Sequence, residues 1–282
     1  MPRFIFFLIF FAVALLQAQH FTGGARSSGL GGSSSTFFDV WSVQNNQAGL
    51  GQIHQVEAGV YYENRFQLKE LTYSAMAFAI PLKKNGAFGV SYNTFGYSAF
   101  RQSKAGLAYG MRFGENFSAG MQLDYFSTGI QDAMNVYGRR SVFTGELGFI
   151  ARLTPQVSVS GHLFNIVRAR LASYNNEVLP MVLKGGLQYK VSEKVLMVFE
   201  TEKQTYADIN LKGGIEYLPA KDVYLRTGAS SFPRQMSFGA GFLYKGLKVD
   251  LASTWHSVLG ISPQISLGYI FSKRGTTEIK SP

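Results

Sequence analysis

The sequence contains no cysteine in its 282 residues, which excludes a disulfide framework, thiol chemistry and a lipid-modified cysteine. Charged residues are also scarce, at 16% of the chain. The balance of 31 Gly and 8 Pro speaks against long helices. After residue 16 no apolar run approaches the roughly 20 residues that a membrane-spanning helix requires. A bundle of membrane helices is therefore excluded as the fold of the main part of the chain.

The first 18 residues form a separate unit. Met1–Arg3 carries positive charge, Phe4–Leu16 is an unbroken apolar run of 13 residues, and LQAQ follows. This three-part pattern predicts a secretory signal peptide that is cleaved after Ala18. The alternative is a membrane anchor, but an apolar run of this length is too short to span a bilayer as a helix.

The chain is rich in aromatic residues, with 24 Phe and 15 Tyr, and these occur in alternating segments. LKGGLQY at 183–189 returns as LKGGIEY at 211–217, a repeat of 28 residues. In the second copy Leu211, Ile215 and Tyr217 share one parity, whereas Lys212 and Glu216 share the other. A period of two is the signature of a strand with one apolar and one polar face. The repeat has the size of one membrane-spanning hairpin.

The same alternation continues over residues 53–271 and predicts fourteen antiparallel strands. They lie at about 53–66, 69–82, 86–98, 100–113, 116–130, 137–153, 155–168, 178–191, 193–205, 207–219, 222–232, 234–245, 247–259 and 263–271. Strands of about 9–15 residues are long compared with the usual 5–6 of globular sheets. Aromatic residues gather near the strand ends, as in an interfacial girdle. We therefore expect an all-β fold, a monomeric transmembrane up-and-down β-barrel in the outer membrane of a Gram-negative cell.

The predicted connections alternate in length, which supports this topology independently. Tight turns fall at 82–86, 113–117, 153–157, 191–195, 218–222 and 244–248, and the other set includes 129–140, 168–180, 202–208 and 230–235. Short turns face the periplasm and long loops face outward in such barrels. An even number of strands places both ends of the barrel on the periplasmic side. The last strand ends at Phe271, which resembles the signal read by the barrel-assembly machinery, and residues 272–282 form a polar tail.

Alternation also predicts which charged side chains face the lumen. They are Lys104, Arg112, Asp124, Glu146, Arg152, Lys184, Lys190, Lys212, Glu216, Lys248 and Asp250. One interpretation is a network of ion pairs that fills the barrel, and the other is a pore with a mild preference for anions. We favour the first, because the Gly- and Ser-rich residues 22–36 are expected to occupy part of the lumen.

Residues 19–52 are predicted to form an N-terminal plug or periplasmic segment, with a short helix over Phe37–Asn46 that is capped near Asp39. A glycine-rich loop followed by a helix can bind phosphate. The Lys-Ser/Thr pair of a phosphate-binding loop is missing, however, and a segment that folds into or under the barrel is the better interpretation.

No constellation of catalytic residues emerges from the sequence. The four histidines are His20, His54, His162 and His256, and neither a hydrolase triad nor metal-ligand spacing surrounds them. The sequence therefore predicts a protein without enzymatic activity or cofactor. A net charge of +10 in an exported chain favours anionic lipid headgroups over nucleic acid as the partner.

The opening GARSSGLGG…NNQAGL at 24–50 resembles the GARSAGMGG…NPAGL opening of PorV/PorQ-like outer-membrane proteins of the Bacteroidota, which belong to the FadL-like barrels. The matching positions are Gly24, Ala25, Arg26, Gly29, Gly31, Gly32, Asn46, Ala48, Gly49 and Leu50. Gln47 stands where the family has proline. The unit at 183–229 resembles the late hairpins of the same family.

The resemblance implies a fourteen-stranded barrel with its N-terminal segment at or in the periplasmic opening. It also implies one of two functions, a component of type IX protein secretion or surface assembly, or a passive FadL-like channel for small hydrophobic solutes. The opening motif favours the first. A channel should have an apolar pocket near the outer loops and a gap in the wall. A secretion component should have a patch of outward aromatic residues or a protruding loop, for which 129–140 and 168–180 are candidates.

Overall fold

The computed structural model describes residues 22–83, 85–131, 136–170 and 178–271. The predicted signal peptide with its cleavage after Ala18, and the polar tail at 272–282, lie outside these residues. The predicted loops at 129–140 and 168–180 lie partly outside them.

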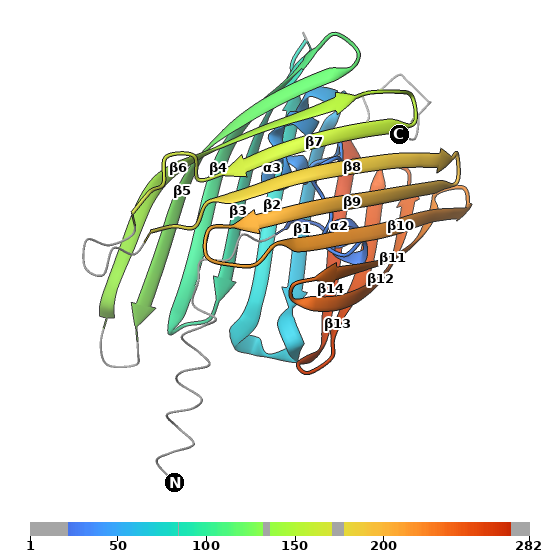
Figure 1. Cartoon of the computed structure of the whole chain (residues 1–282). Helices are drawn as coiled ribbons and strands as arrows, with labels where there is room; N and C mark the ends of the chain where they lie inside the picture. The colour runs from blue at the N-terminus through green and yellow to red at the C-terminus, as the bar shows by residue number, and fades with distance from the viewer. Residues whose placement is uncertain (1–21, 84, 132–135, 171–177, 272–282) are drawn as a thin grey trace.

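Fourteen strands form a single closed barrel in which each strand pairs with its neighbours in the sequence and β1 pairs with β14 (Figure 1). All pairings are antiparallel. The strands are β1 (Val56–Asn64), β2 (Thr72–Pro81), β3 (Gly86–Gly96), β4 (Phe100–Phe113), β5 (Phe117–Gln131), β6 (Val136–Arg152), β7 (Val157–Phe164), β8 (Val182–Ser192), β9 (Val195–Gln204), β10 (Asn210–Ala220), β11 (Val223–Ser231), β12 (Arg234–Tyr244), β13 (Leu247–His256) and β14 (Gly260–Phe271). The predicted all-β transmembrane barrel is confirmed.

Each predicted strand overlaps one observed strand, and the largest differences, of four residues, concern the end of β7 and the start of β8. Strand β7 ends at Phe164, before the predicted end at 168, and β8 begins at Val182, after the predicted start at 178. Asn165 has a positive φ of 59°, and its side-chain oxygen accepts hydrogen bonds from Thr144 Oγ1 at 2.7 Å and from the Ala169 backbone N–H at 2.9 Å. The strand therefore ends because the Asn165 side chain fixes a turn.

The outer face of the barrel is apolar and the inner face is polar, as the alternation predicts. Leu211 is 60% exposed on the outside, whereas its neighbour Lys212 is only 9% exposed and points inward. An apolar outer face is the arrangement of a transmembrane barrel, in which the surrounding solvent is lipid. No helix in the described ranges is both long enough and apolar enough to cross a membrane.

The two ends of the barrel differ. Val56 at the start of β1 pairs with Phe271 at the end of β14, so both ends of the sheet lie together at what we call the terminal end. Connections at the terminal end are short turns. The opposite, loop end carries the longer connections, including the one between β1 and β2, which contains the 3-10 helices η2 (Arg65–Gln67) and η3 (Lys69–Leu71).

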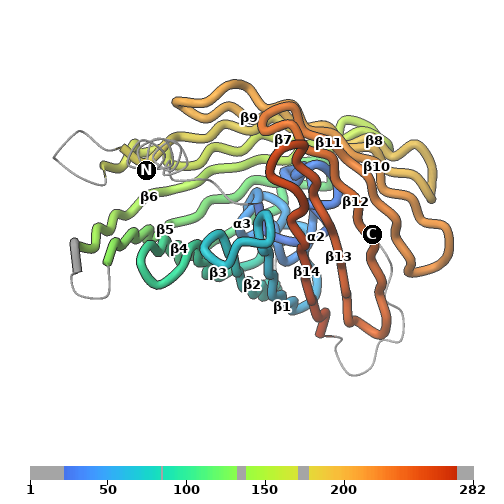
Figure 2. Tube along the Cα trace, turned by 90° about the horizontal axis from the view of Figure 1, so that it is seen from below, coloured from blue at the N-terminus to red at the C-terminus, as the bar shows by residue number. Residues whose placement is uncertain are grey.

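Residues 22–55, which we call the plug, lie inside the ring of strands (Figure 2). They form α2 (Ala25–Gly29), α3 (Ser42–Asn45) and the 3-10 helix η1 (Gln47–Gln52). Helix α2 lies in the Gly- and Ser-rich stretch, where no helix was predicted. The predicted helix over 37–46 is shorter than expected, because Asp39 Oδ1 accepts the Trp41 N–H at 2.9 Å and holds a turn ahead of α3.

Candidate functional site

The candidate site is the lumen, which the plug occupies in close contact with the wall. Glycines on the inner face of the strands permit this contact. A Cβ atom at Gly214 on β10 would lie 2.7 Å from Leu30 Cα, and one at Gly120 on β5 would lie 2.6 Å from the Ala48 nitrogen. Any larger side chain at these positions would displace the plug backbone.

The first attachment is the Glu146 cluster, which comprises Gln47, Lys104, Gln122, Asp124, Glu146 and His162. Glu146 is buried on β6 and pairs with Lys104 from β4. Its second carboxylate oxygen accepts a hydrogen bond from Gln47 Nε2 at 2.6 Å and lies 2.9 Å from His162 Nε2. Gln47 stands where the opening motif that residues 24–50 resemble has proline. Its side chain supplies a hydrogen bond between the plug and a buried carboxylate of the wall.

The second attachment is the Glu200 cluster, which comprises Lys184, Glu200, Glu202 and Lys212. Lys212 Nζ lies 3.2 Å from Glu200 Oε1 and 2.7 Å from Glu202 Oε2. The other oxygen of Glu200 accepts the backbone N–H groups of Ser34 and Ser35, both at 2.9 Å. A single buried carboxylate thus binds the plug backbone directly, and such charge-assisted hydrogen bonds are stronger than neutral ones.

The third attachment is the Arg226 cluster, which comprises Arg26, Asp39, Glu216, Arg226, Lys248 and Asp250. Arg226 donates to Glu216 and to Asp250, each at 2.6 Å. Arg26 of the plug donates to both oxygens of Glu216, at 2.7 and 3.0 Å. Burial acts to lower the pKa of Arg26, but the carboxylates of Glu216 and Asp39 together raise it above its ordinary value. Arg26 therefore stays charged inside the barrel.

The structure places the predicted lumen-facing charges in two groups. Seven are buried in the three clusters, namely Lys104, Asp124, Glu146, Lys184, Lys212, Glu216 and Asp250. Lys248 is partly buried, 3.9 Å from Asp39. The remaining residues lie near the terminal end, where Arg112 is partly exposed and Arg152 is exposed at the end of β6. Lys190 pairs with the exposed Glu193 of the adjoining turn. Parity alone does not place these last residues in the lumen, because their strands end at the mouth.

Sequence reasoning missed several members of the clusters. Glu200 and Glu202 on β9 and Arg226 on β11 have the inward parity of their strands, so the alternation contained the signal. Asp39 and Gln47 come from the plug, for which no periodicity exists. Within the three clusters basic charge is not in excess: the basic residues are Arg26, Lys104, Lys184, Lys212, Arg226 and Lys248, and the acidic residues are Asp39, Asp124, Glu146, Glu200, Glu202, Glu216 and Asp250.

The residues of the opening motif build the plug and attach it to the wall. Asn46 Nδ2 donates to Ser35 O at 2.7 Å and to Phe149 O at 3.2 Å, while its Oδ1 accepts the Ala48 N–H at 3.2 Å. Ala25 N–H donates to Ser266 Oγ at 3.2 Å. The motif glycines with positive φ are Gly24, Gly31 and Gly32. Three other motif residues are buried against neighbouring backbone or side chains, namely Gly29, Gly49 and Leu50. These residues therefore serve the fold of the plug.

Apolar side chains line the lumen beside the plug and toward the loop end. Phe126, Phe164, Leu179 and Val182 form one buried cluster, with Val142 packed against it. On the other side Tyr61 packs edge-on against Trp41 of the plug, with ring centroids 6.0 Å apart. Apolar side chains therefore pack inside the barrel in two places, and one of these clusters includes Trp41 of the plug.

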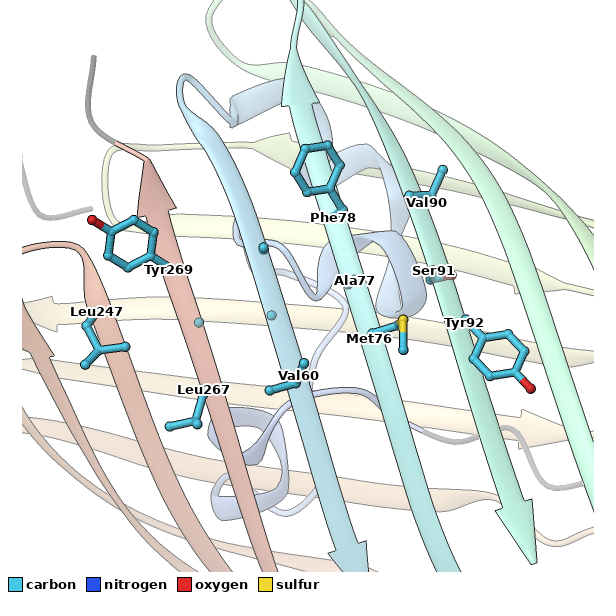
Figure 3. Close-up of a pocket in the computed structure, with 13 residues that line it drawn as sticks. Val60, Met76, Ala77, Phe78, Val90, Ser91, Tyr92, Leu247, Leu267 and Tyr269 are labelled. Carbon is cyan, nitrogen blue, oxygen red and sulfur yellow. The ribbon is translucent and has the colours of Figure 1, made fainter. Parts of the chain in front are cut away.

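An apolar groove of about 540 Å³ lies on the outer face of the wall over β13, β14, β1, β2 and β3 (Figure 3). Its labelled residues Val60, Met76 and Leu267 project away from the plug, whose helices lie behind the strands. Gly59 also lines the groove, and a Cβ atom there would lie 3.0 Å from both Trp41 and Val40 of the plug. Only the backbone of β1 separates the groove from the plug at this point.

The wall is continuous through this region. β1 pairs with β14 from Val56 to Glu63 and with β2 from Glu57 to Asn64, without a shift in register. Among the described residues the only irregular registers fall near strand ends, in the β5–β6, β8–β9 and β10–β11 pairs. The gap in the wall that we expected of a channel is thus not seen in the described part of the barrel.

Comparison with known proteins identifies relatives by fold. No family model and no curated protein matches the sequence. The Pseudomonas putida toluene transporter TodX is 13% identical, with a TM-score of 0.67 over 89% of this chain and 99% of the transporter. The Ralstonia pickettii toluene transporter TbuX is 12% identical, with a TM-score of 0.65 over 89% and 98%. A Pseudomonas aeruginosa FadL homologue is 11% identical, with a TM-score of 0.67 over 89% and 99%. The barrel and its plug therefore have the fold of these proteins.

Proposed function

We propose that this protein is an outer-membrane channel that carries small hydrophobic solutes by passive transport, without enzymatic activity. The observation that carries the proposal is a closed fourteen-stranded barrel filled by its own N-terminal plug, which matches nearly the full length of solved toluene transporters. The apolar outer face and the short turns at the terminal end support an outer-membrane location, with the loop end outside the cell.

In this proposal the solute enters from the loop end, where Phe126, Phe164 and Leu179 form a buried apolar cluster that has to open to receive it. The plug closes the way to the terminal end. Because the described wall is continuous, passage requires the plug to shift. A shift would break the hydrogen bonds of Gln47 to Glu146 and of the Ser34 and Ser35 backbone to Glu200. The three clusters therefore set how readily the channel opens.

The absence of cysteine permits a direct test with an engineered disulfide. Ser160 Oγ on β7 lies 2.8 Å from Ser35 Oγ of the plug, so the S35C/S160C pair would lock the plug to the wall. A matched control is S127C/S141C, since these two hydroxyls lie 3.2 Å apart on neighbouring wall strands and do not involve the plug. The assay is the initial rate of toluene uptake by cells of a host that lacks such a channel.

We expect the unmodified protein to raise the uptake rate above that of empty cells. Oxidised S35C/S160C should abolish the gain and a reducing agent should restore it, whereas S127C/S141C should behave like the unmodified protein in both states. Uptake equal to that of empty cells with the unmodified protein would refute the channel. Full uptake through the oxidised plug–wall pair would refute the need for plug movement.

A component of type IX secretion or surface assembly is the second candidate, favoured by the opening motif from Gly24 to Leu50. None of the solved structures named above is a secretion component. Affinity purification of the tagged protein from its native outer membrane, followed by mass spectrometry, tests this candidate. Stoichiometric recovery of a large secretion barrel or a surface cargo would favour it over the channel. Recovery of a lone barrel would favour the channel.

A further inference from the structure

Three rows of side chains lie in register across β3, β4, β5 and β6 near the loop end. The apolar row is Tyr92, Ala105, Tyr125 and Phe143. The hydroxyl row is Thr94, Ser103, Ser127 and Ser141. The arginine row is Gly96, Arg101, Gly129 and Arg139. Residues directly opposite one another in an antiparallel sheet project from the same face, so each row is a continuous strip across four strands.

All three rows face outward. They share parity with Leu107 on β4 and Leu123 on β5, which are among the most exposed apolar residues of the outer wall. Arg101 and Arg139 are both exposed. These strips therefore belong to the outer surface of the barrel and are not part of the lumen.

The rows lie where the apolar band of the wall ends. Strands in such barrels are tilted by about 35–45°, so each residue rises about 2.5 Å along the membrane normal for about 3.3 Å along the strand. On β4 the outward positions from Phe113 to Ser103 therefore rise about 25 Å, which is the height of the apolar band and puts the hydroxyl row at its edge. The arginine row follows about 5 Å further out, at the level of the lipid headgroups.

The hydroxyl row is already ordered by hydrogen bonds. Ser127 Oγ accepts from Arg139 Nε at 2.7 Å and from Ser141 Oγ at 3.2 Å. Tyr92 of the apolar row donates to Ser103 Oγ at 3.4 Å. One nitrogen of the Arg139 guanidinium is thus fixed toward the hydroxyl row, which orients the planar group along the surface of the wall.

The space between the two arginines is open. A Cβ atom added at Gly129 would have nothing closer than 3.9 Å, and strand spacing of about 4.8 Å sets Arg101 and Arg139 about 10 Å apart at their Cα atoms. Neither arginine takes part in any ion pair formed by the described residues. Two exposed guanidinium groups that pair with no carboxylate in the part of the chain that the structure describes, on either side of a glycine, suit a bridging phosphate.

We propose that this strip binds one phosphorylated lipid of the outer leaflet. The phosphate lies between Arg101 and Arg139, Ser103 and Ser141 of the hydroxyl row contact the polar part of the headgroup, and the acyl chains pack on Tyr125 and Phe143, while the buried Ser127 only orders the row. Charge complementarity favours a phosphate, and the apolar row on the other side of the hydroxyl row favours a lipid over a soluble anion. On β8 and β10 the outward residues at the loop end are instead apolar, such as Leu183 and Leu211. The proposal depends on the outer-membrane location and is independent of solute passage.

The test titrates the purified full-length barrel in detergent with monophosphoryl lipid A and counts bound lipids by native mass spectrometry. The variant is R101Q/R139Q, and the matched control is R234Q, which removes an exposed outward arginine at the loop end of β12. We expect at least a tenfold loss of affinity in R101Q/R139Q and no change in R234Q. Lipid A that lacks phosphate should bind the unmodified barrel weakly. Its affinity should be no higher than the affinity of monophosphoryl lipid A for R101Q/R139Q.

Equal losses in R101Q/R139Q and R234Q would overturn the proposal, as would equal binding of the dephosphorylated lipid. Binding of soluble glucosamine 1-phosphate as tight as that of the lipid would overturn the assignment to a lipid. Heat-modifiable migration on gels checks that each barrel is folded. Should R101Q/R139Q not fold, S103A/S141A keeps both charges and is expected to weaken lipid binding several-fold. Unchanged affinity in that variant would count against the proposal.

Discussion

Replacement of Glu146 by alanine should release the plug before the wall unfolds. Glu146 is the buried acceptor for Lys104, Gln47 and His162 together. After E146A the nearest carboxylate to Lys104 is Asp124, at 3.7 Å. Removal of one partner of a buried ion pair typically costs about 3–5 kcal/mol, because the other charge remains buried without compensation. We expect a destabilisation of at least about 3 kcal/mol, part of it in the attachment of the plug.

The two tryptophans of the chain allow the plug and the wall to be followed separately. Trp41 is buried in the plug, whereas Trp255 is 47% exposed on the outer wall. In a W255F background, urea titration in detergent micelles followed by fluorescence reports the plug, and in a W41F background it reports the wall. E146A should move the Trp41 transition to lower urea by more than it moves the Trp255 transition.

The matched control for E146A is E193A. Glu193 pairs with Lys190 in a turn at the terminal end, where its side chain is 91% exposed. Exposed pairs contribute about 0–1 kcal/mol, so this variant should follow the unmodified protein closely. If E146A and E193A gave the same Trp41 transition, the argument that buried ion pairs hold the plug would be wrong.

Three further predictions use the same assays. Q47P should be tolerated by the backbone, since position 47 opens a 3-10 helix and the preceding residue is extended. The variant loses the hydrogen bond to Glu146, so plug attachment should weaken by about 1.5–3 kcal/mol, measured as a shift of the Trp41 fluorescence transition to lower urea. G214L should force Leu30 off the wall, and limited proteolysis should then cut the plug while the barrel stays folded and resistant. M121R places a charge near the middle of the apolar band and should destabilise the wall by about 2–4 kcal/mol, measured from the Trp255 transition. An unchanged urea midpoint of that transition would contradict the placement of this face in lipid.

The barrel could be predicted from the sequence because its signal is local. Leu211 and Lys212 fall on opposite faces by parity alone, and the same rule repeated over the chain yields fourteen strands. The end of β7 could not be predicted, because it depends on the Asn165 side chain and on partners in other segments. Local alternation carries no information about such contacts.

The arrangement of the site was predictable only in part. Parity places Glu200 inside the barrel, but nothing in the sequence indicates that it receives the N–H groups of Ser34 and Ser35, which are 166 and 165 residues away. Inward charges can pair across the lumen in many combinations. The path of the plug decides which of these pairs form, and the plug sequence has no periodicity that would predict this path. The sequence therefore predicted that ion pairs form inside the barrel, but not which residues pair.

The plug has a further consequence for the order in which the molecule is assembled. Its residues leave the ribosome before any strand, yet Arg26 binds Glu216 and the Ala25 N–H binds Ser266, at sequence separations of 190 and 241 residues. The final strand, which contains Ser266, is also the one that closes the sheet against β1. The earliest part of the chain must therefore wait for the latest before it can reach its native contacts, so insertion of the wall and sealing of its interior are coupled events at the end of biogenesis.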